Sequence, residues 1–251
     1  MFLNKFKQHF GDKSIENLTA EDILNFLTEN CEGQKQSTKR LKYTLLKSFF
    51  NFTIATSDLN VANPTEAPVF KKVFRIAKGH PGTILEKDVI DEVIFKTEKP
   101  RNRLMMELMA RGGMRVGEVL KLRVMDVEER KLRIKDPKSG RQYEFVFIPQ
   151  KVADRLKSYI QSKNIHSEQR VFSLGYSGAR EVVKNAGESI GIRLRPHDLR
   201  RHAATYASRV GAPLEIVSKV ILRHANLSTT QRYLGKVSDT EAIRWIENIH
   251  G

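Results

Sequence analysis

Residues 222–233 read LRHANLSTTQRY, and this stretch places His224 nine residues before Tyr233. Residues 228–231 (STTQ) have the form of a capping box, in which a Ser or Thr side chain and a Gln side chain satisfy the first backbone groups of a helix. The pattern predicts that a helix begins at Ser228 and carries Tyr233 in its second turn.

Two earlier segments carry residue types that can act on a phosphate. Residues 112–120 read GGMRVGEVL and include Arg115, and residues 195–205 read RPHDLRRHAAT and include His197 and Arg200. Taken singly, such an Arg is more often a surface charge, and such a His is more often a helix cap or a core residue. The set therefore has to be judged together.

A short β region lies between these segments. Residues 132–134 and 143–148 alternate in polarity like strands, and residues 137–140 (PKSG) supply turn residues between them. We expect a hairpin with Lys138 at or near its tip. Since the rest of the chain reads as helices, the predicted fold class is mainly α with a small antiparallel β-sheet.

The N-terminal part predicts helices. Thr19 is a candidate N-cap, with Asp22 three residues later. A second helix is predicted from about Ser37 to Phe52, apolar on one side and basic on the other. Its basic residues are Lys35, Lys39, Arg40, Lys42 and Lys47. A basic face of this kind suggests phosphate contact, although a solvated surface is the simpler interpretation of any single helix.

The length of 251 residues favours two domains. The predicted boundary is a basic stretch that ends in glycine and proline near residue 80, and residues 79–84 are its linker. Both parts carry an excess of positive charge, which is compatible with a clamp that has two basic faces.

The formal net charge is +15, with 44 Lys and Arg against 29 acids. Such an excess favours a polyanionic partner, because each neutralised phosphate releases counterions. The longest apolar runs are too short to cross a bilayer, and no secretory signal is apparent. Cys31 is the single cysteine, which excludes an internal disulfide and a cysteine-rich zinc site. We expect a cytoplasmic protein.

The ordered set resembles the catalytic domain of the tyrosine recombinases, the phage integrase family that includes the Xer recombinases. That family's pattern is an Arg followed three residues later by an acid, a hairpin Lys, His-x-x-Arg, and then a His and a Tyr nine residues apart. The resemblance implies a helical core-binding, SAM-like DNA-binding domain at 1–78 and a catalytic domain at 85–251. The partner that it implies is double-stranded DNA.

The chemistry suits these residue types. In-line attack on a phosphodiester adds charge to its non-bridging oxygens, which the guanidinium groups of Arg115 and Arg200 can clamp. The phenol of Tyr233 is the expected nucleophile, and it would form a phosphotyrosyl bond. Because that bond conserves the energy of the phosphodiester, a DNA hydroxyl can reseal the strand, and no cofactor and no metal are implied.

Proton transfer is assigned partly by the resemblance. It makes Lys138 the general acid that protonates the leaving sugar oxygen, with Lys135 as a competitor. His197 and His224 would hydrogen-bond the scissile phosphate and help to move protons, and either can be the base. Glu118, one helical turn after Arg115, is expected to orient cations rather than to act in catalysis.

One departure from the family pattern is Arg223, which stands where the family usually has glycine. Arg223 is expected either to alter the turn there or to add a phosphate contact. Residues 239–249 form a predicted amphipathic helix with Ile243, Trp245 and Ile246 on its apolar side. It packs on its own domain or, by the resemblance, docks on a neighbouring subunit, which leads us to expect a homo-tetramer on paired DNA sites.

The function implied is site-specific recombination. DNA strands would be cleaved and rejoined through a 3'-phosphotyrosyl intermediate and a Holliday junction, for integration, excision or dimer resolution. Two alternatives remain open: strand relaxation like that of a type IB topoisomerase, and a catalytically silent architectural DNA-binding protein. The presence of both Arg115 and Tyr233 disfavours the silent alternative.

Overall fold

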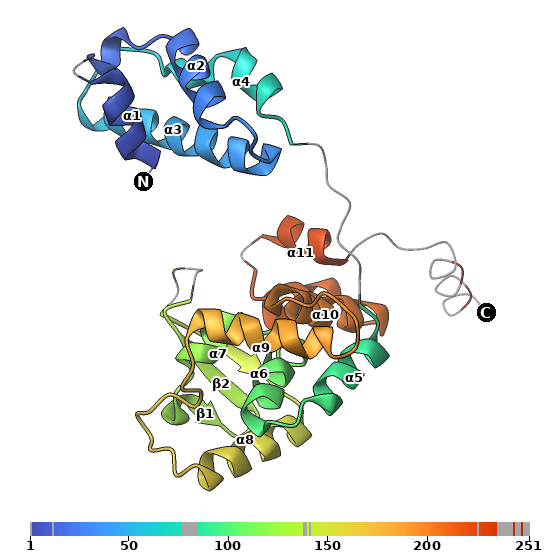
Figure 1. The fold of residues 1–251 in the computed structure, drawn as a ribbon. Helices are drawn as coiled ribbons and strands as arrows, with labels where there is room; N and C mark the ends of the chain where they lie inside the picture. The colour runs from blue at the N-terminus through green and yellow to red at the C-terminus, as the bar shows by residue number, and fades with distance from the viewer. Residues whose placement is uncertain are drawn as a thin grey trace. The chain divides into compact units, whose positions relative to one another are not determined.

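The computed structural model describes residues 2–11, 13–76, 85–137, 140, 142–224, 226–234, 243 and 247. The chain divides into two compact units, Met1–His80 and Pro81–Gly251 (Figure 1). Lys138, the predicted linker 79–84 and most of the predicted C-terminal helix 239–249 lie outside the described residues.

The first unit is helical in its described part. Its elements are α1 (Phe2–Phe10), η1 (Ile15–Asn17), α2 (Ala20–Asn30), α3 (Gln36–Thr56), η2 (Pro64–Glu66) and α4 (Pro68–Val73). The predicted cap of α2 is confirmed, because Thr19 and Asp22 form a reciprocal capping box. Phe6, Phe26 and Phe50 are buried in the aromatic core of this unit.

The second unit is mainly helical with a small sheet. It begins with α5 (Lys87–Lys96), α6 (Pro100–Ala110), α7 (Val116–Lys121) and η3 (Val124–Asp126). The strands β1 (Val127–Glu128), β2 (Lys131–Lys135) and β3 (Tyr143–Phe147) follow. The chain continues with α8 (Gln150–Ser162), α9 (Tyr176–Glu188), α10 (Pro196–Arg209), η4 (Ile216–Ile221), which is a π-helical segment, and α11 (Leu227–Leu234).

The described strands form an antiparallel sheet in the order β1-β2-β3. The predicted hairpin is confirmed, with Leu132 opposite Val146 and Ile134 opposite Glu144. The short strand β1 was not predicted. The fold class, mainly α with a small antiparallel sheet, is confirmed.

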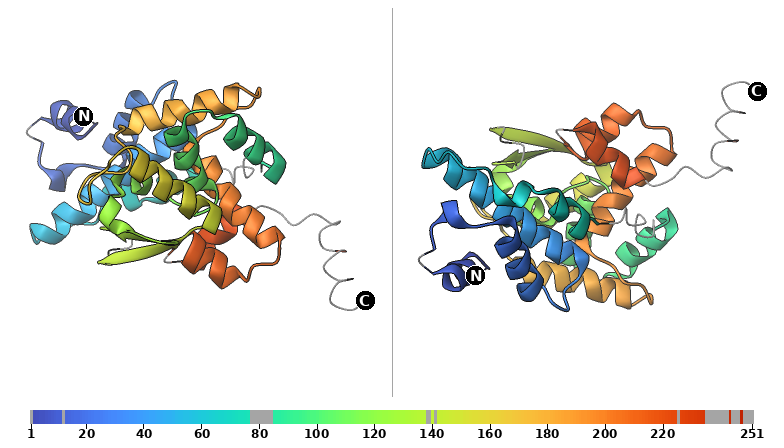
Figure 2. Two further views of the ribbon diagram at one scale, coloured as in Figure 1. Left: turned by 90° about the horizontal axis from the view of Figure 1, so that it is seen from below. Right: turned by 90° about the horizontal axis from the view of Figure 1, so that it is seen from above.

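Helix α6 forms the centre of the second unit and packs against α10, α8, α5 and α7. Its residues from Leu104 to Ala110 are all buried, including Glu107. Strand β3 packs against η4, and both views in Figure 2 draw the β2–β3 hairpin beside the segment from α10 to α11. This packing brings together the segments that carry the predicted site residues. Among the described residues, no helix is long and apolar enough to cross a membrane.

Candidate active site

Arg115 lies at the start of α7 and is held by Glu118. Its backbone N–H donates to Oε2 of Glu118 at 2.8 Å, and its Nη1 donates to Oε1 at 2.6 Å. The turn before it depends on Gly113, whose φ is +62° and where an added Cβ would lie 2.7 Å from the carbonyl oxygen of Ile221. Only glycine tolerates both conditions. The Arg115 guanidinium is therefore oriented by a carboxylate on its own helix.

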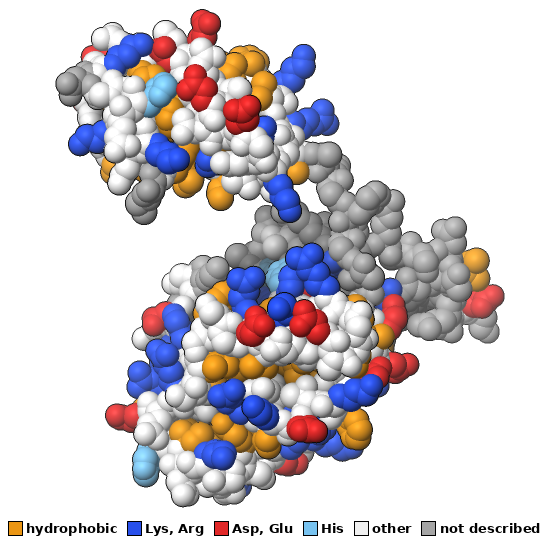
Figure 3. Space-filling view, viewed as in Figure 1, with side chains coloured by type: hydrophobic (Ala, Val, Ile, Leu, Met, Phe, Trp, Pro, Cys, Tyr) orange, Lys and Arg blue, Asp and Glu red, His pale blue; other side chains and the backbone are white. Residues whose placement is uncertain are grey.

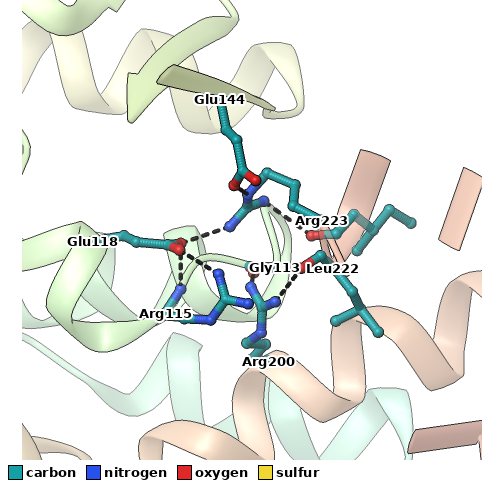
Figure 4. A network of polar contacts seen from close by, with 8 residues as sticks. Gly113, Arg115, Glu118, Glu144, Arg200, Leu222 and Arg223 are labelled. Carbon is teal, nitrogen blue, oxygen red and sulfur yellow. Dashed lines mark hydrogen bonds and ion pairs between the residues drawn. The ribbon is translucent and has the colours of Figure 1, made fainter. Parts of the chain in front are cut away.

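Arg200 is a buried cation that ties α10 to two other segments. Its side chain donates to the carbonyl oxygens of Gly113, before α7, and of Leu222, at the end of η4 (Figure 4). A guanidinium presents several donors in a fixed plane, so it can hold two carbonyls at once. Arg200 thus links the turn that precedes Arg115 to the segment that precedes His224.

His197 lies in the first turn of α10, and much of the residue is exposed although its ring is partly desolvated by the groups around it. The helix is capped by Arg195, whose backbone N–H and side chain both donate to Asp198. Partial burial lowers the pKa of His197, and the positive charge of Arg200 adds to this while Asp198 opposes it. The neutral imidazole is therefore favoured.

His224 follows η4 and contacts α11. Its backbone N–H donates to the carbonyl oxygen of Ser218 at 2.9 Å, and its Nδ1 lies 3.0 Å from Oγ1 of Thr230. The Thr230 hydroxyl is buried and lies 2.8 Å from the hydroxyl of Ser218. Burial, aided by the positive charges of Arg200 and Arg115, lowers the pKa of His224 to about 4. The ring is therefore neutral at neutral pH.

The helix that carries Tyr233 begins earlier than predicted. Helix α11 starts at Leu227, and its cap is Asn226, whose Oδ1 accepts from the backbone N–H of Ser228 at 2.9 Å. The prediction that Ser228 begins the helix was therefore wrong, because the helix is already capped two residues earlier, where the Asn226 side chain accepts from the backbone N–H of Ser228. The backbone of Tyr233 lies in the second turn, as predicted, whereas its side chain lies outside the described residues.

Arg223 does not extend toward solvent. Its side chain is 3% exposed and lies between two carboxylates, with Nη2 2.6 Å from Oε2 of Glu118 and Nε 3.4 Å from Oε2 of Glu144. The expectation of an added phosphate contact was wrong, because the guanidinium is buried and already paired with these two acids. The φ of Arg223 is +51°, so the arginine adopts the left-handed conformation that favours glycine, and this φ gives no sign of the other expectation, an altered turn.

Sequence reasoning missed Glu144. The side chains of β3 alternate, so that Glu144 and Val146 are buried while the aromatic side chains of Tyr143 and Phe147 are about half exposed. Polarity alone predicts the opposite arrangement. The sequence signal that could have revealed it is the alternation of side chains along the strand, because Glu144 lies on the same face as the apolar Val146.

A cavity of about 910 Å³ lies beside these groups. Arg115, His197, Arg200 and Lys135 line it, and Lys135 is paired with the buried Asp126 at 3.1 Å. The other basic lining residues are Lys121, Arg123, Arg133, Arg170, Arg180 and Arg195. In the space-filling view, Lys and Arg side chains gather along the upper edge of the second unit (Figure 3). The cavity therefore suits an anion.

Of the predicted site residues, the fold brings Arg115, His197 and Arg200 to this cavity. His224 is not among its lining residues, but it lies close enough to Arg200 and Arg115 for their charges to lower its pKa. Within the described residues, no group of three His, Cys, Asp or Glu side chains is arranged to hold a metal ion.

Residues 84–238 match the model of the phage integrase family. The chain belongs to this family. It is 30% identical over 228 residues to the tyrosine recombinase XerA of Thermococcus onnurineus, covering 86% of this chain and 77% of that protein. It is 31% identical over 258 residues to a tyrosine recombinase of Thermosipho africanus, covering 95% and 87%.

Solved structures share the fold. A transposon Tn1549 integrase bound to transposon right-end DNA aligns with a TM-score of 0.73 and 14% identity, over 100% of this chain and 91% of that one. The XerH recombinase bound to its difH substrate aligns with a TM-score of 0.72 and 21% identity, over 98% and 77%. The family match and the two relatives confirm the expected family: the chain is a Xer-like tyrosine recombinase, a DNA strand-transferring enzyme.

Proposed function

We propose that this recombinase acts at specific DNA sites, which it cleaves and rejoins through a 3'-phosphotyrosyl intermediate and a Holliday junction. The observation that carries the proposal is the basic cavity that Arg115, Arg200 and His197 line, next to the segment from His224 to α11. The biological task would be integration, excision or the resolution of chromosome or plasmid dimers.

In the proposed cleavage step, the phenolic oxygen of Tyr233 attacks the scissile phosphorus. The new bond joins phosphorus to the tyrosine, the bond from phosphorus to the 5' oxygen breaks, and a 5' hydroxyl leaves after it gains a proton. Arg115 and Arg200 would bind the non-bridging oxygens, where negative charge increases in the transition state. Support for this role comes from the fixed orientation of both guanidiniums.

The proton of Tyr233 would pass to His224 or His197. Both rings are favoured in the neutral form, since the pKa of each is lowered, and a neutral imidazole can accept a proton. The contact of His224 with Thr230 supports His224, because it ties the ring to the helix that carries the nucleophile.

Lys138 is proposed as the general acid that protonates the 5' oxygen, and it lies outside the described residues. Lys135 lines the cavity, but its ammonium lies 3.1 Å from Oδ1 of the buried Asp126, and this ion pair holds the side chain away from a substrate. The pairing supports Lys138 over Lys135. No cofactor enters the proposed reaction, since the reverse attack by the 5' hydroxyl restores the phosphodiester.

The first unit would bind double-stranded DNA as a core-binding domain. Helix α3 supports this assignment, because its Lys and Arg side chains are suited to phosphate contact. Four copies would assemble on paired sites in the cytoplasm, linked through the C-terminal segment.

The experiment is covalent trapping on DNA. A library of short nicked duplexes with randomised sequence is incubated with the wild type, with Tyr233→Phe and, as a matched control, with Tyr206→Phe, which changes a tyrosine of α10 that stacks on His202. We expect adducts that survive denaturation for the wild type and the control and none for Tyr233→Phe. Tight binding without an adduct would favour the architectural alternative. Relaxation of supercoiled DNA without strand exchange would favour the topoisomerase-like one.

A further inference from the structure

Arg223 occupies a position that is unfavourable for an arginine in two ways. Its φ of +51° lies in the left-handed region, where a side chain adds strain that glycine avoids. Its guanidinium is almost fully buried, with 3% of the side chain exposed, and a buried charge is costly unless it is paired. An arginine at this position therefore has to be compensated by specific partners.

Three partners surround the guanidinium (Figure 4). Nη2 lies 2.6 Å from Oε2 of Glu118 in α7, and Nε lies 3.4 Å from Oε2 of Glu144 in β3. Nη1 donates at 3.0 Å to the carbonyl oxygen of Ile221, at the end of η4. One side chain thus connects the end of η4, which lies two residues before it, to two elements that are distant in the sequence, Glu118 in α7 being 105 residues away.

Each connected element adjoins a group of the proposed reaction. Glu118 orients Arg115 through two hydrogen bonds. Glu144 belongs to the hairpin that contains Lys138, and Arg223 itself directly precedes His224. We propose that Arg223 is a positioning residue that fixes the phosphate clamp, the hairpin and the histidine segment relative to one another. The inference rests on the proposed function.

The charge of Arg223 also affects the electrostatic environment of Arg115. Two carboxylates, Glu118 and Glu144, approach the same guanidinium, and both are largely buried. Without the cation of Arg223, the buried Glu144 would lose the cation with which it pairs, and Glu118 would lose its second partner. Arg115 would then face an excess of negative charge. A lysine cannot replace the arginine fully, because its single ammonium lacks the fork that reaches two acids.

The test compares Arg223→Gly, Arg223→Lys and Glu144→Gln with the wild type. It uses the full chain and the nicked duplex recovered by trapping, and it measures the single-turnover rate of adduct formation at saturating protein and, separately, the affinity for DNA. Glu107→Gln is the matched control, because the buried carboxylate of Glu107 pairs at 2.7 Å with the partly exposed Arg155 in the same unit. Its loss should reduce stability without altering the cleavage rate.

We expect Arg223→Gly to form the adduct about tenfold to a hundredfold more slowly than the wild type, by analogy with metal sites, where loss of a residue that orients a ligand costs about that much activity. Arg223→Lys should recover part of the rate, and Glu144→Gln should be slower than the control. DNA affinity should stay close to that of the wild type in all four.

Arg223→Gly separates the proposal from a role in the turn alone. If the residue only shapes the backbone, glycine should relieve the strain and keep the wild-type rate, and that result would overturn the inference. Equal slowing of Arg223→Gly and Glu107→Gln would also overturn it, as a general effect of destabilisation. If Arg223→Gly does not fold, wild-type rates of adduct formation for both Arg223→Lys and Glu144→Gln would overturn the inference. Failure of the wild type to form an adduct would count instead against the proposed function.

Discussion

The Nδ1 atom of His224 lies 3.0 Å from Oγ1 of Thr230, and this contact joins the segment before α11 to the helix that carries Tyr233. The Thr230 hydroxyl also lies 2.8 Å from that of Ser218 in η4. The orientation of the imidazole therefore depends on two buried hydroxyls. A hydrogen bond of this kind selects which ring nitrogen carries the proton.

Thr230→Val keeps the shape of the side chain and removes its hydroxyl. We expect adduct formation to slow by about tenfold, because the ring of His224 loses its orienting partner. We also expect a loss of about 1–3 kcal/mol in the free energy of unfolding, because buried polar groups lose a partner. Rapid-quench cleavage assays measure the rate of adduct formation, and urea denaturation measures the free energy of unfolding. Ser228→Ala, which changes an exposed hydroxyl on the same helix, should match the wild type.

Arg200→Lys keeps the charge and removes the fork that holds two carbonyls. The cleavage rate should fall by about 10²–10³-fold, the range typical for removal of a donor to a transition-state oxyanion. Because the carbonyls of Gly113 and Leu222 lose their donor, the unfolding transition should also move to lower denaturant concentration. Arg155→Lys, in the ion pair with Glu107, serves as the control. A wild-type cleavage rate in Arg200→Lys would exclude the clamp.

The lowered pKa of His224 predicts a dependence of stability on pH. Burial and the charges of Arg200 and Arg115 lower this pKa from 6.5 to about 4. Between these values the unfolded chain binds the proton more tightly, so the stability contributed by the neutral ring is complete above about pH 6.5 and decreases as the pH falls toward about 4.

The measurement is the melting temperature as a function of pH for the wild type and for His224→Gln. Between pH 6.5 and 4, the melting temperature of the variant should fall less than that of the wild type. The pKa of His197 is lowered too, and its titration would add to the effect. The comparison is therefore made between two proteins that both carry His197→Gln, one with and one without His224→Gln. Identical pH profiles for the two proteins would show that His224 does not have this shifted pKa.

Asn226→Ala removes the cap of α11. The free energy of unfolding should decrease by about 1 kcal/mol, the typical value for loss of an N-cap side chain. Because α11 carries Tyr233, adduct formation should slow as well. Asn226→Asp is the matched control, since aspartate accepts the same hydrogen bond. An unchanged melting curve for Asn226→Ala would show that the contact with Ser228 contributes nothing to the helix.

The sequence predicted what depends on local patterns. The cap of α2 by Thr19 and Asp22 and the pairing of β2 with β3 follow from residues close together in the chain, and both are confirmed. The family could also be recognised, because its motif orders residue types along the chain. The structure adds the contacts that hold Arg115 and Arg200 in place.

The features that the sequence did not predict depend mostly on contacts between residues far apart in the chain. Arg223 was expected either to alter the turn or to reach a phosphate, and only the tertiary structure, in which η4 packs against β3, reveals its two carboxylate partners, Glu118 and Glu144. Glu144 was hidden because an acid on the buried face of a strand contradicts the usual alternation. The cap of α11 was misplaced because Asn226 and Ser228 are both favourable N-cap residues, and local sequence does not decide between them.

The most direct test of the central claim is to identify the residue that becomes covalently bound to DNA. The wild-type adduct is isolated, digested with a protease and a nuclease, and analysed by tandem mass spectrometry. We predict a single modified peptide with a 3'-linked nucleotide on the phenolic oxygen of Tyr233. A nucleotide on any other residue, or an adduct that persists in Tyr233→Phe, would contradict the account.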